Sequence, residues 1–108
     1  MANGVVNANN DYSNKEVYMD LIEKYLREHS DGKDYPICSS ELAKEFGVPR
    51  TTIRRMINTA RSNGSPICSS PKGYYITADK EEIKNTIESL RGRIQKMEKA
   101  IAGLEACL

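Results

Sequence analysis

The sequence predicts a mainly α fold, in which three short helices and a β-hairpin form one small α+β domain and a long helix follows. Two amphipathic segments flank Gly47, where a left-handed residue is expected. Two short β-inclined segments bounded by Pro and Gly follow at 66–77. From Ile83 to Leu108, apolar residues then recur at alternating intervals of four and three, which is the repeat of a coiled coil.

The 108 residues divide into three segments by composition. Residues 1–13 are rich in Asn, Gly and Ala, and we expect them to be disordered. Residues 14–78 hold the patterns of the small domain, and residues 79–108 hold the coiled-coil repeat. The chain is therefore predicted to be one domain with one appended helix.

The net charge of +1 conceals an uneven distribution. Residues 1–49 carry five Lys/Arg and nine Asp/Glu, a net charge of −4. Residues 50–78 carry five Lys/Arg and no acidic residue, a net charge of +5, and residues 79–108 carry six of each kind. A positive field confined to one short segment is typical of a surface that faces phosphate.

Three cysteines, Cys38, Cys68 and Cys107, lack the even number of a disulfide framework and the C-x-x-C spacing of a zinc site. Cys38 and Cys68 each lie in a Pro-Ile-Cys-Ser-Ser pentapeptide, at 36–40 and 66–70. We expect both to pack as small apolar residues in short strands.

The first helix is predicted over Lys15–Glu28, with Ser13 or Asn14 as its cap. A turn-forming stretch ends this helix, and Tyr35–Cys38 is predicted to be a brief strand. The apolar residues of the helix follow one stripe: Val17, Tyr18, Leu21, Ile22, Tyr25 and Leu26.

The second helix is predicted over Glu41–Phe46, capped by Ser39 or Ser40. Gly47 then supplies the left-handed conformation that ends a helix, and Val48 fills the gap before the next helix. Three residues of the second helix are expected to point inward: Leu42, Ala43 and Phe46.

The third helix is predicted from Pro49, which suits a first turn because its missing N–H costs nothing there. Strands are predicted at Pro66–Ser69 and Tyr74–Thr77, around the loop Ser70–Gly73. The order helix, strand, helix, helix, strand, wing, strand defines a winged helix-turn-helix. The buried face of the third helix is expected to consist of Ile53, Ile57 and Ala60.

A resemblance to a known family is carried by Leu42-Ala43, Phe46-Gly47-Val48 and Arg50-Thr51-Thr52-Ile53-Arg54-Arg55-x-Ile57. These residues resemble the winged helix-turn-helix at the amino end of biotin-ligase-type repressors, and Lys72–Ile76 is similar to that group's wing strand. The resemblance covers residues 17–77 and departs at Pro49, where the family often has serine or threonine. It implies DNA binding. The roughly 30 residues that follow carry a coiled-coil pattern rather than a ligase domain, so the enzyme is not implied.

The outward face of the third helix is expected to bind duplex DNA. Four residues near its start are placed to reach base edges: Thr51, Arg54, Arg55 and Asn58. Arginine matches guanine, and asparagine matches adenine, through two hydrogen bonds each. Phosphate contacts set register without reading sequence, and we expect them from Arg50, Thr52, Arg61 and the wing residue Lys72.

A solvated surface is the competing interpretation of the four arginines and of Lys72. The absence of acidic residues from 50–78 and the preceding turn favour DNA. Thr51 and Thr52 are equally consistent with plain surface residues. Tyr74 and Tyr75 alternate across a strand, so one is expected in the core and the other on the DNA side.

The last helix is predicted to start at Asp79-x-x-Glu82, a capping-box pattern. Isoleucine at heptad position a and leucine at d favour a parallel pair, in which Arg93 meets Glu98 of the partner. An antiparallel pair, with Arg91 facing Glu105, and higher bundles remain open. Eight residues form the predicted dimerisation seam: Ile87, Ile94, Ile101 and Leu108 at a, and Ile83, Leu90, Met97 and Leu104 at d.

These patterns together predict a homodimeric, sequence-specific protein that binds duplex DNA, most simply a transcriptional regulator of bacterial or phage type. No apolar run approaches 18 residues and no signal-peptide pattern is present, so we predict no membrane association. The expected location is cytoplasmic, and nucleoid-associated when the protein is bound to DNA.

No enzyme is predicted, and no cofactor, metal or small-molecule ligand. The chain has a single histidine and no phosphate loop, H-E-x-x-H motif or paired carboxylates. Two alternatives to a regulator remain: a protein-interaction module in a replication or phage-related assembly, and a thiol sensor that acts through Cys107 beside the seam.

Overall fold

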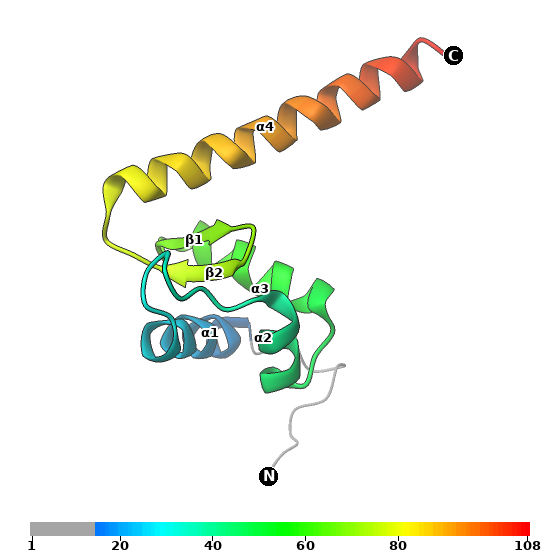
Figure 1. The fold of residues 1–108 in the computed structure, drawn as a ribbon. Coiled ribbons are helices and arrows are strands. Elements are labelled where there is room, and N and C mark those ends of the chain that lie inside the picture. The colour runs from blue at the N-terminus through cyan, green and yellow to red at the C-terminus, as the bar shows by residue number, and fades with distance from the viewer. Residues whose placement is uncertain (1–14) are drawn as a thin grey trace. The chain divides into compact units, whose positions relative to one another are not determined.

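The computed structural model describes the backbone of residues 15–108 and the side chains of residues 20–108. The segment predicted to be disordered, residues 1–13, and the two candidate caps Ser13 and Asn14 lie outside the described residues. The elements in order are α1 (Lys15–His29), α2 (Ser39–Phe46), α3 (Arg50–Ser62), β1 (Ile67–Ser70), β2 (Gly73–Ile76) and α4 (Lys80–Glu105) (Figure 1). They form two compact units, one ending at Thr77 and the other comprising Ala78–Leu108.

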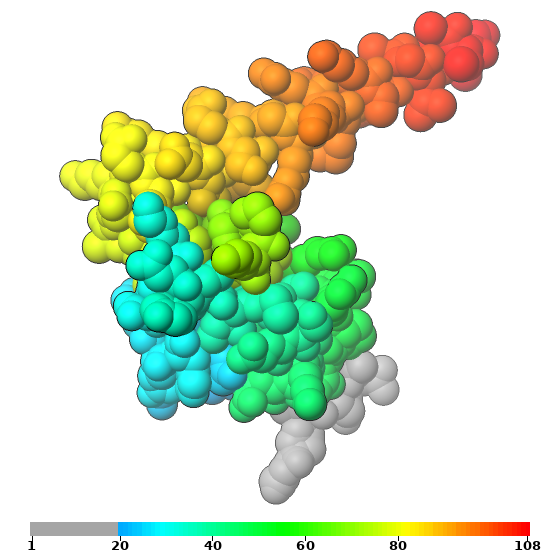
Figure 2. Space-filling view, viewed as in Figure 1, coloured from blue at the N-terminus to red at the C-terminus, as the bar shows by residue number. Residues whose placement is uncertain are grey.

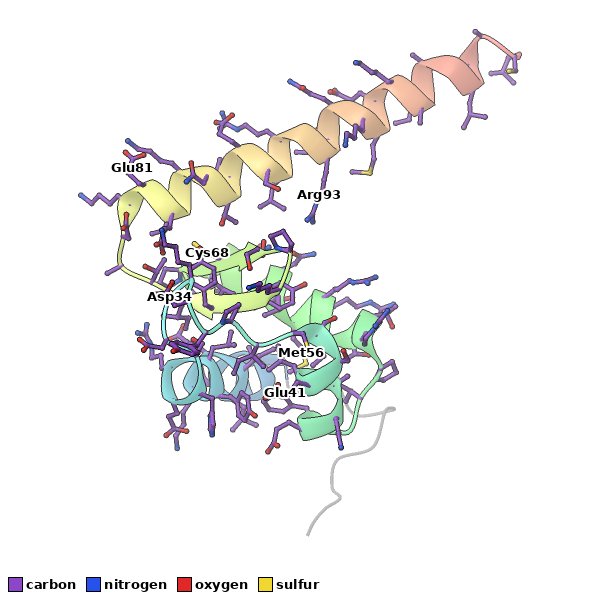
Figure 3. The ribbon with its side chains drawn as sticks, viewed as in Figure 1. Asp34, Glu41, Met56, Cys68, Glu81 and Arg93 are labelled. Carbon is purple, nitrogen blue, oxygen red and sulfur yellow. The ribbon has the colours of Figure 1, made fainter. Side chains whose placement is uncertain are left out.

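The first unit is built around a core to which α1, α2, α3 and the hairpin all contribute. Every predicted inward residue of α3 is buried, and Ile53 and Ala60 have no exposed surface. Met56, labelled in Figure 3, is also buried, although the sequence does not predict this. Its burial follows from the contacts of α3 with α1, α2 and β1, which cover a wider stripe of the helix than the three predicted positions. The buried cluster comprises Ile22, Leu26, Ile37, Leu42, Ile53, Met56, Ile57, Ala60 and Ile67.

The turn between α2 and α3 follows the sequence prediction at its centre. Gly47 adopts the left-handed conformation, with φ 66° and ψ 35°, and the Val48 amide donates to the Ala43 carbonyl at 3.1 Å. Pro49 is the N-cap residue of α3, whose first helical residue is Arg50. The Pro49 carbonyl accepts the amides of Thr52 and Ile53 at 3.0 and 3.2 Å, so the turn fixes the direction in which α3 leaves α2.

The predicted start of α2 is wrong in detail. The N-cap residue is Cys38 rather than Ser39 or Ser40, which are already helical, and no side chain caps this end. Cys38 is exposed, so the prediction that it packs as a small apolar residue is also wrong, whereas Cys68 is buried as expected. The pKa of the Cys38 thiol is lowered, chiefly by its hydrogen bond with the Ser40 hydroxyl.

The strand predicted at Tyr35–Cys38 is reduced to two isolated bridges, one of Tyr35 with Asp31 and one of Ile37 with Tyr74. Ile37 and Tyr74 exchange both backbone hydrogen bonds, each 2.8 Å long, and no further pair extends the ladder. Pro36 has no N–H to donate, and Cys38 already caps α2. The flanking residues on both sides are therefore unable to continue the pairing.

The wing is an antiparallel hairpin whose strands lie within one residue of the predicted positions. Ile67 pairs with Ile76 and Ser70 pairs with Gly73, so Pro71 and Lys72 alone form the loop. Gly73 has φ +147°, and a Cβ built on it would lie 2.4 Å from the Ile37 carbonyl oxygen. The hairpin can approach the Ile37 bridge only because this residue has no side chain.

We expect Gly73→Ala to destabilise the first unit. An unfavourable backbone conformation alone costs about 1–3 kcal/mol, and the loss here should be larger because the alanine methyl group would also clash with backbone atoms. Near-ultraviolet circular dichroism during heating should show a fall in Tm of at least about 4 °C. The matched control is Gly64→Ala, because Gly64 also has positive φ but open space around it. Equal losses from the two substitutions would contradict the proposed close approach.

The second unit is one helix. The Asp79 carboxylate accepts the amides of Glu81 and Glu82, which confirms the predicted cap. The helix ends at Glu105, and the Cys107 and Leu108 amides bond three residues back, so Leu108 lies beyond the helix although the apolar repeat includes it. No described helix is both long enough and apolar enough to cross a bilayer.

Candidate nucleic-acid interface

Five of the seven α3 side chains that the sequence predicts to contact DNA are exposed. At about 100° per residue, the buried residues Ile53, Ile57 and Ala60 occupy one side of the helix. Thr51, Arg55 and Asn58 lie on the opposite side and Arg54 at its edge. All four are exposed, as is Arg50 at the start of the helix. Figure 2 shows the surface of α3 and the preceding turn, in green, at the outside of the first unit.

This face is positive because nothing acidic belongs to it. No Asp or Glu occurs between residues 50 and 78, and the first turn of α3 has none. Among the described residues, neither Arg50 nor Arg54 forms an ion pair, whereas Arg27, Lys84 and Arg91 each pair with a glutamate on their own helix. The guanidinium groups of Arg50 and Arg54 are therefore available to an anionic partner.

Several hydroxyl and amide groups of α3 are already engaged with its backbone. The Thr59 hydroxyl donates to the Arg55 carbonyl at 2.8 Å, and the Ser62 hydroxyl donates to the Asn58 carbonyl at 2.9 Å. Such bonds to the preceding turn are common for Ser and Thr within helices. Ser62 is exposed beside Asn58 and was missed in the sequence reasoning, although its spacing of four residues from Asn58 placed it there.

Arg61 does not lie on the exposed face with the other arginines. It is half-buried, its Nε donates to the Ile67 carbonyl at 2.8 Å, and its guanidinium carbon lies 5.8 Å from the centre of the Tyr74 ring. The helical angle explains this position, because residue 61 follows Ile57 by one turn at the edge of the buried stripe. Arg61 thus joins α3 to both strands of the wing. Thr52 is also half-buried.

The wing presents Lys72 separately from α3. Lys72 is exposed in the two-residue loop, and its amide bonds to the Ser70 hydroxyl at 3.2 Å. Of the two tyrosines in β2, Tyr75 is buried and Tyr74 is half-buried under Arg61. The unit therefore offers a helix face with guanidinium and amide donors and, on a neighbouring hairpin, one ammonium group.

The far end of α3 is held by α1. The Ser65 hydroxyl donates to the Glu23 carboxylate, which also accepts from Arg27 Nε at 3.1 Å. The hydrogen bond from Ser65 is the main reason that the pKa of Glu23 is below its usual value, and desolvation opposes it. The bond from Ser65 joins the loop after α3 to α1.

No metal-binding constellation occurs in the part of the chain whose side chains are described, residues 20–108. There, no three His, Cys, Asp or Glu side chains come together in a group that could hold a metal ion. The groups available at the surface of α3 are instead hydrogen-bond donors, which match phosphate oxygens and base edges.

A comparison with models of protein families gives a match to an HTH domain over residues 23–75. The match runs from the middle of α1 to β2 and includes the turn at Gly47, all of α3 and the wing loop. No curated protein matches the chain. The order of the elements and the exposed basic face of α3 agree with this match, which supports a helix-turn-helix DNA-binding domain over residues 23–75.

Proposed function

We propose that this protein is a winged-helix transcriptional regulator of bacterial or phage type that reads duplex DNA as a homodimer. The observation that carries the proposal is the exposed arginine face of α3 in a segment without acidic residues. The likeness of residues 17–77 to the DNA-binding end of biotin-ligase-type repressors supports it. The protein acts in the cytoplasm, on the nucleoid.

The residues divide into three roles. Thr51, Arg54, Arg55 and Asn58 contact base edges in the major groove, while Arg50, Thr52 and Lys72 contact phosphates or, for Lys72, the adjacent minor groove. The sequence predicts a phosphate contact for Arg61. Because its Nε is bonded to the Ile67 carbonyl, we now give it the role of holding the wing against α3.

Dimerisation is assigned to the seam of α4, the eight a and d residues from Ile83 to Leu108. Side chains of this seam are exposed in the single chain, among them Ile94, Met97, Ile101 and Leu104. An exposed apolar row of this length marks a protein interface. The same row supports a second candidate function, that of a module that docks onto other proteins and does not bind DNA.

The dependence of binding on salt separates the two functions. We expect the protein to bind random-sequence duplex DNA at low salt, as measured by fluorescence anisotropy. The logarithm of the association constant should fall linearly with the logarithm of the salt concentration. The slope should be about −0.9 for each phosphate that a Lys or Arg neutralises, so Arg50 and Lys72 predict a slope of roughly −2 or steeper per subunit. Binding that is absent at low salt, or insensitive to salt, would reject the DNA-binding proposal in favour of protein docking.

A further inference from the structure

The apolar row of α4 needs a partner, and the proposed homodimer supplies a second copy of α4. Ile94, Met97, Ile101 and Leu104 are 51%, 59%, 54% and 71% exposed. The following inference rests on the proposed homodimer and concerns the direction of the second helix. Apolar residues alone do not set that direction, whereas the charges that flank a coiled-coil seam do.

One side of the seam carries a charged residue in every heptad, at position e. The first two are basic and the last two are acidic: Lys84, Arg91, Glu98 and Glu105. All four are exposed. Within the chain, Lys84 and Arg91 form only long ion pairs with Glu81 and Glu88, at 3.6 and 3.9 Å. Exposed pairs of this kind contribute little, so the four charges are available to a partner.

An antiparallel pair brings the e positions of the two helices together. With Ile94 packed against Met97 of the second copy, Ile87 lies against Leu104 and Leu90 against Ile101. Ile83 is level with Leu108, which lies beyond the helix. In this alignment Lys84 faces Glu105, and Arg91 faces Glu98. Two-fold symmetry repeats both contacts, so all eight e residues of the dimer meet an opposite charge.

Neighbouring antiparallel alignments are less favourable. A shift of one heptad in one direction pairs Arg91 with Glu105 but makes Glu98 face its own copy. The opposite shift makes Arg91 face its own copy. The e-position charges therefore select the alignment centred between Ile94 and Met97.

A parallel pair uses these charges poorly. Between Ile83 and Leu108 it brings opposite charges together only at Arg93 and Glu98, because Arg91 would meet Thr86 and Glu105 would meet Ala100. Asp79, at the preceding g position, already caps α4 through the Glu81 and Glu82 amides. Position a of the first heptad is a lysine, which would face its own copy.

We infer that α4 binds a second copy of itself in the antiparallel direction, with Lys84–Glu105 and Arg91–Glu98 contacts across the seam. The first residues of the two helices then lie about 45 Å apart along the pair, at 1.5 Å per residue. The two DNA-binding units are attached at opposite ends, so the dimer is suited to hold two separate DNA segments rather than adjacent half-sites.

Spin labels on Cys107 measure the direction in the whole protein. In a Cys38→Ser/Cys68→Ala background, Cys107 is the single cysteine. An antiparallel pair places the two copies of Cys107 about 35 Å apart along the axis, whereas a parallel pair separates them by about the interaxial distance of 8–10 Å. Double electron–electron resonance should give the long distance, and the short distance would overturn the inference.

Charge reversal provides an independent test. Lys84→Glu/Arg91→Glu makes every e residue acidic and should weaken dimerisation at least tenfold in sedimentation equilibrium. Mixing this variant with Glu98→Lys/Glu105→Lys should restore a dimer, which a general loss of helix could not do. The matched control is Arg93→Glu, which leaves an antiparallel pair unchanged but places two glutamates together in a parallel pair. Weakening by Arg93→Glu alone would reject the antiparallel direction.

The outcomes also separate this inference from the proposed function. A chain that remains monomeric at all concentrations refutes the homodimer and the antiparallel pairing together. A dimer with the short Cys107 distance refutes only the direction, and a tetramer refutes the two-helix pair. DNA binding by the first unit is measured separately by its salt dependence.

Discussion

Loss of Arg54 and Arg55 should abolish most DNA binding by this protein. Both side chains are exposed on α3, near the helix start that a helix-turn-helix protein places in the major groove. A well-formed contact of arginine with guanine contributes about 1–3 kcal/mol. Arg54→Ala/Arg55→Ala should therefore weaken binding by about 2 kcal/mol or more, roughly 30-fold. Fluorescence anisotropy with a selected operator duplex measures this loss.

The control for this variant must remove the same charge elsewhere. Lys96→Ala/Lys99→Ala does so at exposed positions c and f of α4, away from the seam. We expect this control to retain wild-type affinity to within a few fold. On random-sequence DNA, the arginine variant should also show a shallower salt slope if either side chain contacts phosphate. Equal losses in the two variants would mean that net charge, and not the face of α3, governs binding.

A charge placed in the middle of the α4 seam should dissociate the proposed homodimer. Ile94→Asp removes an apolar side chain that contributes about 1.5–3 kcal/mol when fully buried, and the dimer contains two copies. The carboxylate must also be desolvated or leave the interface open. We expect the dissociation constant to rise by about 100-fold or more, measured by sedimentation equilibrium.

Gln95→Asp is the matched control, because it introduces the same carboxylate one residue away, at the exposed position b of the same heptad. It should leave the association state unchanged. If Ile94→Asp is as dimeric as the control, the seam of α4 is not the dimer interface. The fold of the first unit should be the same in both variants, because Ile94 belongs to the second unit.

Local patterns were sufficient for the elements whose signals are contained in a few neighbouring residues. Gly47 marked the turn between α2 and α3, and it has the left-handed conformation that the sequence demanded. Asp79 marked the start of α4 and accepts two backbone amides there. The inward residues of α3 were also correct, because helical periodicity fixes which side chains share a face.

Patterns of this kind failed where the partner of a residue lies elsewhere in the chain. Arg61 resembles the other arginines of α3 in sequence, yet it is bonded to the Ile67 carbonyl and lies over Tyr74. At the edge of the buried stripe, the Arg61 side chain can point either to solvent or to the wing. Its contacts with the wing decide between these two directions. The burial of Met56 was missed for a related reason. The elements packed against α3 bury more of the helix surface than the positions of Ile53, Ile57 and Ala60 indicate.

The repeated pentapeptide Pro-Ile-Cys-Ser-Ser separates what the sequence determines from what the tertiary structure determines. At 66–70 its last four residues are the strand β1, paired with β2, and Cys68 is buried. At 36–40 only Ile37 pairs with a strand, Cys38 caps α2 and is exposed, and both serines are helical. The sequence alone determined the helices, the glycine turn and the buried side of α3, because each depends on spacing along one segment. The tertiary structure decided the conformation of the two pentapeptides and the direction of the Arg61 side chain. These depend on hydrogen bonds between distant segments, which leave no periodic pattern in the sequence.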